Sequence, residues 1–123
     1  MAEMATYIGV TPRTEVCNVA IGRGLRAVYG ANGQLTLAGA TVRGDYVLMV
    51  DGEAGQPAAC CAMNEGAKVP AVAAVAVAAG DPAYSAANGQ WTNVSTGAAI
   101  CGRFTQPASG AGVLTEVEIE NVF

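Results

Sequence analysis

Apolar and polar residues alternate in short runs along this chain, and clusters of glycine, proline, asparagine and aspartate separate the runs. Alternation with a period of two is typical of β-strands, and such clusters are typical of turns. About ten short strands at regular spacing favour an all-β fold, a small barrel or sandwich of antiparallel strands with little helix. The expected strands are Cys17–Ile21, Leu25–Tyr29, Gln34–Leu37, Tyr46–Val50, Ala58–Met63, Lys68–Val72, Ala83–Ala86, Trp91–Val94, Ala99–Phe104 and Leu114–Ile119.

A six-residue string occurs twice, as Ala-Asn-Gly-Gln-Leu-Thr at 31–36 and as Ala-Asn-Gly-Gln-Trp-Thr at 87–92, 56 positions apart (87 minus 31). Asn-Gly between apolar runs predicts a β-hairpin, because a tight two-residue turn needs positive φ at both central positions. The sequence therefore predicts the same hairpin twice. Agreement beyond the dipeptide favours real internal similarity, and independent convergence on one turn type is the alternative.

The middle of the chain is harder to interpret. Alanines in Val69–Ala79 favour helix, whereas its valines favour strand. We expect a strand followed by a short turn or a single helical turn before Gly80. The runs Ala58–Met63 and Lys68–Val72 are expected to pair with each other around the turn residues 64–66.

The first fourteen residues have weak periodicity and contain Thr11-Pro12. We expect residues 1–14 to form an N-terminal arm and residues 15–123 to form a single β domain. No basic segment precedes an apolar run, and no apolar run is long enough to span a bilayer. The expectation is a chain made in the cytoplasm, without a membrane as partner.

Composition indicates a thin core. Hydrophobic residues make up 52% of the 123, but many are alanine, and aromatic residues make up only 6%. Charged residues are sparse at 13%, which fits a chain that hides surface against partners, and we expect a homo-oligomer. The net charge is −4 and the six basic residues are scattered, so no basic stripe predicts nucleic-acid binding.

Few residues suit catalysis or metal binding. Histidine is absent, and Asp45, Asp51 and Asp81 each adjoin a glycine, where aspartate typically caps a turn. Adjacent Cys60 and Cys61 would point to opposite faces of a strand, and no pair of cysteines has metal-ligand spacing. We expect no enzyme activity, no cofactor and no metal, with the four cysteines as small buried apolar groups.

Several turn and strand motifs occur in a fixed order: Gly80–Tyr84, Asn88-Gly89, Thr92–Val94, Gly97, Ile100 and Gly102. This order resembles the C-terminal half of a family of small bacteriophage head-decoration (capsid cement) proteins. Leu37–Ala40, Val47-Leu48, Gly55–Pro57 and Lys68-Val69 resemble the family's earlier half, so the resemblance covers residues 22–119. The chain departs from the family pattern at Ala83, Arg103-Phe104 and the Cys60-Cys61 pair.

The resemblance implies a homotrimer on the outer capsid surface of a virion. It would bind the major capsid protein, bridge neighbouring capsomers and stabilise the mature head. Tyr7, Ile8 and Arg13 are the candidate capsid contacts in the arm, with a plain disordered tail as the alternative. Trp91 is a candidate interface anchor, with packing beside a strand as the alternative.

Three other functions stay open at this point. The first is a glycan-binding β-sandwich module of a phage tail or spike, in which Trp91 and Tyr84 would form a stacking platform. The second is an enzyme in which Asp45 and Asp81 converge. The third is a structural barrel that assembles only with itself.

Overall fold

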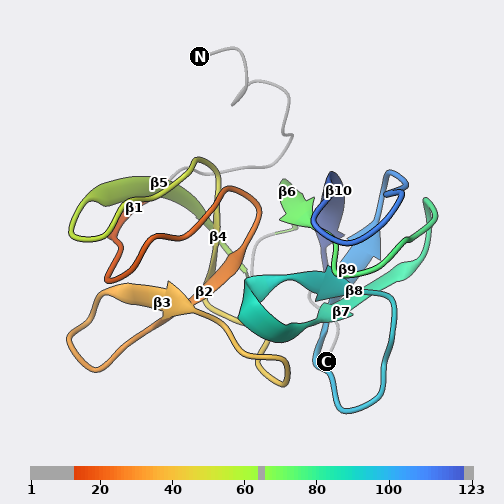
Figure 1. The fold of residues 1–123 in the computed structure, drawn as a ribbon, viewed down its shortest axis with the longest axis horizontal. Helices are drawn as coiled ribbons and strands as arrows, with labels where there is room; N and C mark the ends of the chain where they lie inside the picture. The colour runs from red at the N-terminus through yellow and green to blue at the C-terminus, as the bar shows by residue number, and fades with distance from the viewer. Residues whose placement is uncertain (1–12, 64–65, 121–123) are drawn as a thin grey trace.

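The computed structural model describes residues 13–63 and 66–120, which form two antiparallel five-stranded sheets and almost no helix. Figure 1 shows the first sheet on the left, in red to yellow-green, and the second on the right, in green to blue. Neither sheet closes into a barrel, so the all-β expectation is confirmed in its sandwich form. The first sheet has the order β1-β5-β4-β2-β3. Its strands are β1 Arg13–Val16, β2 Arg26–Tyr29, β3 Leu35–Leu37, β4 Tyr46–Leu48 and β5 Pro57–Ala62.

The second sheet repeats the first. Its order is β6-β10-β9-β7-β8, which is the same topology with each strand number raised by five. The strands are β6 Lys68–Val72, β7 Pro82–Ser85, β8 Trp91–Thr92, β9 Ile100–Phe104 and β10 Leu114–Ile119, with a short 3-10 turn η1 at Ala87–Gly89.

Matching hydrogen bonds extend the repeat into the loops. Ile21 and Gly52 exchange two backbone hydrogen bonds, and Val77 and Ala108, each 56 positions later (77 minus 21, 108 minus 52), exchange the same two. The similarity predicted from the Asn-Gly strings therefore covers two whole five-stranded units, called here the first half (13–63) and the second half (66–120).

The two Asn-Gly turns differ in detail. In the second, Asn88 (φ 57°) and Gly89 (φ 73°) both have positive φ, as a two-residue turn requires. In the first, Gly33 has positive φ (76°) but Asn32 does not, so the expected two-residue turn is wrong there. The same backbone hydrogen bond spans three residues in both loops, from the Gly30 N–H to the Gln34 carbonyl and from the Ala86 N–H to the Gln90 carbonyl. In the first loop the Asn32 side chain also accepts the Gln34 N–H. Each hairpin nevertheless forms: β2 pairs with β3, and β7 with β8.

Two predictions about the elements are corrected by the structure, and a third is confirmed. The strand expected at Cys17–Ile21 is absent, because Cys17 makes only one bridge and the strand β1 lies before it, overlapping the end of the expected arm. Strands β5 and β6 lie in different sheets, so the pairing expected between them is wrong. The strand and turn expected in Val69–Ala79 are present: β6 ends at Val72, Ala73 and Val77 each make one further bridge, and a turn lies at residues 79–80.

Two apolar clusters fill the molecule, and adjacent cysteines face different ones. Cys60 lies in the cluster of the first half, with Leu35 and Leu48, while Cys61 lies in the larger cluster that also holds Val117 of the second half. The opposite orientation expected from the strand period is confirmed. Since one face of β4 and β5 packs into the larger cluster, the two halves share a core.

The thiols of Cys17, Cys60, Cys61 and Cys101 are all fully buried, and none forms a disulfide. Burial raises the pKa of Cys60 to about 12 and also raises the pKa of Cys17 and Cys101. Because the thiolate is the nucleophile, we expect none of the four to react with a disulfide reagent such as DTNB at pH 8 in the folded chain. All four should react in guanidinium chloride. A thiol that reacts at full rate before denaturation would contradict the burial described here.

Candidate functional site

Arg26 joins the two halves. Its side chain is fully buried, and within the described part of the chain its guanidinium donates to backbone carbonyl oxygens alone. Burial lowers the pKa of Arg26, but arginine stays charged because its ordinary value is far above neutrality. The acceptors are Ala86 (2.6 Å) and Gln90 (2.8 and 3.2 Å) in the second half, and Arg43 (3.2 Å) and Val42 in the first.

Trp91 lies beside Arg26 in this junction. It is 0% exposed, its ring centroid is 5.7 Å from the Arg26 guanidinium carbon, and its Nε1–H donates to the Gly24 carbonyl at 2.7 Å. The burial favours the packing interpretation of Trp91. A side chain with no exposed surface offers no face to a sugar, so the stacking platform of Trp91 with Tyr84 does not form in this conformation.

Arg43 makes a second connection between the halves. Its Nη2 donates to the carbonyls of Met63 and Glu120, both at 2.7 Å, and its Nη1 donates to that of Ile100 at 3.0 Å. Met63 follows β5, whereas Ile100 and Glu120 belong to the second half. One planar guanidinium thus holds three separate backbone segments, a task that a lysine ammonium would perform with less geometric precision.

A surface hollow of about 440 Å³ lies in the first half, next to the start of β1. Arg13, Tyr29, Asp45 and Tyr46 line it, together with Arg43. The two tyrosine rings meet edge to face with centroids 5.6 Å apart, and Tyr29 donates its hydroxyl to Tyr46 at 3.0 Å. That hydrogen bond is the main cause of the raised pKa of Tyr29. Aromatic rings beside two cationic side chains suit contact with a protein segment.

Of the candidate site residues, Arg13 and Trp91 are described. Arg13 is exposed in β1 and lies at the rim of the hollow, while Trp91 is buried in the junction. Tyr7 and Ile8 lie outside the described residues, so their role stays a prediction. The sequence interpretation did not single out Arg26, Arg43 or the Tyr29–Tyr46 pair as functional residues.

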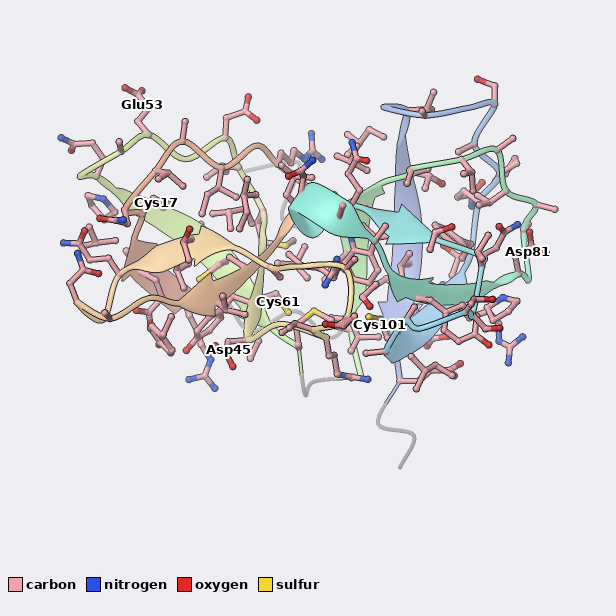
Figure 2. The ribbon with its side chains drawn as sticks, turned by 60° about the horizontal axis from the view of Figure 1, so that its bottom comes forward. Cys17, Asp45, Glu53, Cys61, Asp81 and Cys101 are labelled. Carbon is pink, nitrogen blue, oxygen red and sulfur yellow. The ribbon has the colours of Figure 1, made fainter. Side chains whose placement is uncertain are left out.

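The side chains of Asp45 and Asp81 accept hydrogen bonds from nearby backbone N–H groups. Asp45 accepts the N–H of Tyr29 at 3.1 Å, and Asp81 accepts the N–H of Ala78 at 2.9 Å. The Ala78 hydrogen bond, followed by one from Asn93, lowers the pKa of Asp81. Figure 2 shows Asp45 and Asp81 at well-separated places on the two halves, so these carboxylates do not converge.

Among residues 13–63 and 66–120, no three His, Cys, Asp or Glu side chains gather as a metal ion would need. Within the same residues there is no helix with the length and apolarity to cross a membrane.

The fold matches a solved structure over nearly its whole length. The N base of the head fiber gp8.5 of bacteriophage phi29 superposes with a TM-score of 0.71, covering 90% of this chain and 94% of that chain at 16% sequence identity. At this identity the likeness establishes the fold. No protein-family model and no curated protein sequence matches the chain.

Proposed function

We propose that this chain is a structural protein of a phage head, a decoration protein that binds the outer surface of the capsid. The observation that carries the proposal is the likeness to a head-fiber base over 90% of the chain. The resemblance of residues 22–119 to head-decoration proteins supports the same conclusion from the sequence. Its partners are the major capsid protein and further copies of this chain, in a homotrimer.

The described architecture supports a role in holding proteins together. The two guanidinium groups of Arg26 and Arg43 fasten the halves through backbone carbonyls, so binding surfaces on both halves keep a fixed separation. Preorganised surfaces lose little conformational entropy when they bind. In this proposal the protein acts through shape and multiple contacts, without catalysing a reaction.

Attachment follows from multivalency. Three arms on one trimer would bind three capsid sites, and each bound arm raises the effective concentration of the next. Binding only the expanded lattice stabilises that lattice by mass action, which opposes the pressure of the packaged genome. A trimer that bridges neighbouring capsomers detaches from the capsid only when all of its contacts with them dissociate at the same time.

The arm is tested by a deletion of residues 1–12. The deletion stops before Arg13, because Arg13 and Thr14 pair with Cys60 and Ala59 in β1 and their loss would damage the sheet. We expect the shortened chain to keep its fold and oligomeric state while its affinity for heads falls about a hundredfold or more. Cosedimentation with undecorated heads of the virus that encodes the chain measures this loss.

The substitutions Tyr7→Ala and Ile8→Ala separate specific contacts from a plain tail. Either should weaken head binding, and Arg13→Ala should do the same at the rim of the hollow. If the chain without residues 1–12 occupies heads as fully as the whole chain does, the arm is not the capsid contact.

A further inference from the structure

Two loops on the surface of the molecule contain no charged residue of their own. They consist of residues 39–42, between β3 and β4, and residues 93–100, between β8 and the start of β9, and neither segment contains Asp, Glu, Lys or Arg. They include three of the exposed large apolar side chains, Val42 (43% exposed), Val94 (52%) and Ile100 (38%). We call these two segments together the neutral surface.

The two segments belong to different halves but lie against each other. The hydroxyl of Ser85 donates to the Ala40 carbonyl at 2.6 Å and accepts the Ala99 N–H at 2.8 Å. Arg43 donates to the Ile100 carbonyl, so its guanidinium points toward backbone oxygens. Figure 1 draws both loops along its lower edge, the first in yellow-orange and the second in cyan.

The loops of the neutral surface are held in place by their own turns. Val42 donates its N–H to the Gly39 carbonyl at 3.3 Å, and Ala98 donates to the Ser95 carbonyl at 3.1 Å. Together with the Ser85 bridge, these hydrogen bonds fix the loops before any partner arrives, which reduces the entropy lost on binding.

Charge decides which partner suits this surface. The chain has a net charge of −4, and Glu116, Glu118 and Glu120 follow one another along β10 and its end, each half-exposed. Two copies that meet through such a face bring carboxylates together, which is unfavourable. The neutral surface contributes no carboxylate from its own residues, and Asp81, which accepts from Asn93 at 3.0 Å, lies at one end of it. Depletion of charge together with exposed apolar side chains is the composition of an interface core.

We propose that the neutral surface is where a second copy of this chain binds. This inference rests on the proposed function, because the proposed function includes a homotrimer and the inference names the surface through which its copies bind. Val42, Val94 and Ile100 are the apolar contacts of this interface, and residues of both halves contribute to it.

The test places carboxylates on the neutral surface. Val42→Glu combined with Val94→Glu should convert the oligomer to a folded monomer, as measured by sedimentation velocity. Val19→Glu combined with Val75→Glu is the matched control, because these valines are also exposed (36% and 37%) and the charge change is identical. The control pair should leave the oligomer intact.

Further variants make the test independent of folding. Val42→Ser with Val94→Ser adds no charge and should raise the dissociation constant of the oligomer about tenfold or more. A lysine pair at the same two positions should dissociate the oligomer as the glutamate pair does, because a charge of either sign would be buried in the interface without a partner. Buried thiols that stay unreactive confirm that each variant is folded.

A monomeric unmodified chain would overturn the inference, and so would an oligomer that persists in the folded glutamate pair. An oligomer that persists in the folded lysine pair would also count against it. Head binding is measured separately by cosedimentation. Loss of the oligomer in the glutamate pair supports the neutral surface even if the unmodified chain does not bind heads, and that second result would contradict the proposed function alone.

Discussion

Replacing Arg26 by alanine is expected to lower the free energy of unfolding by about 3–5 kcal/mol, because several hydrogen bonds between its guanidinium and backbone carbonyls are lost together. The substitution removes the Arg26 donor from the partly buried carbonyls of Ala86, Val42 and Arg43, while the Gln90 carbonyl keeps the Ala86 N–H as donor. A buried acceptor without a partner costs about 1–3 kcal/mol. The indole of Trp91 also loses the cation 5.7 Å from its ring centroid.

Equilibrium denaturation in guanidinium chloride measures this loss. Arg26→Lys should recover part of the stability, because it keeps the charge but cannot reach all the carbonyls at once. Arg103→Ala is the control: the Arg103 side chain is 54% exposed and makes a surface ion pair with Glu120 at 3.4 Å. Such pairs contribute about 0–1 kcal/mol. If the Arg26 and Arg103 variants unfold at the same denaturant concentration, Arg26 does not hold the halves together.

Gly102→Ala is expected to destabilise the second sheet by about 3 kcal/mol or more, at or above the upper end of what overpacking costs. Gly102 lies in β9 and pairs with Ile119 of β10. A Cβ atom on Gly102 would lie 2.0 Å from the carbonyl oxygen of Glu118 and 3.0 Å from its carbon. Both atoms belong to backbone, so the added methyl group can be accommodated only if β9 and β10 move apart.

Gly110→Ala is the matched control for this substitution. The Cβ atom would meet nothing within 4 Å, and Gly110 is not among the described glycines with positive φ. Its effect should stay within about 0.5 kcal/mol, as for surface substitutions generally. Thermal unfolding followed by circular dichroism compares the two variants. Equal melting temperatures would mean that the close approach of β9 and β10 is not required.

Local patterns predicted the local structure. The Asn-Gly strings predicted both hairpins, because a turn and its flanking strands are encoded within about ten residues. The alternation around Cys60 and Cys61 predicted their opposite orientation, because the side-chain period of a strand is two. The repeat could be predicted from the two copies of one string, although its extent was visible only in the structure.

Pairing between distant segments could not be predicted in the same way. Strands β5 and β6 are close in sequence and were expected to pair, yet β6 pairs with β10 from the end of the chain. Periodicity specifies which face of a strand is buried but not which strand lies beside it. The strand β1 was missed for a related reason: Arg13–Val16 has little apolar character and forms a strand because β5 offers it an edge.

The candidate site was predicted only in part. Arg13 is exposed at the rim of the hollow, and its contact role stays a prediction, whereas Trp91 is enclosed within its own chain. Nothing in the sequence distinguishes Arg26 from the other basic residues, because its burial depends on carbonyls about sixty positions away, at Ala86 and Gln90. The neutral surface likewise combines segments from both halves, and only the fold brings them together.

The most direct test of the account is to count this polypeptide in purified mature heads of the virus that encodes it, by quantitative mass spectrometry against the major capsid protein. The account predicts many copies per head, in a constant ratio to the capsid protein, removable from intact particles and therefore external. Mature heads that lack the polypeptide, and that do not take it up when the purified chain is added, would contradict the proposal that it is a capsid-binding structural protein.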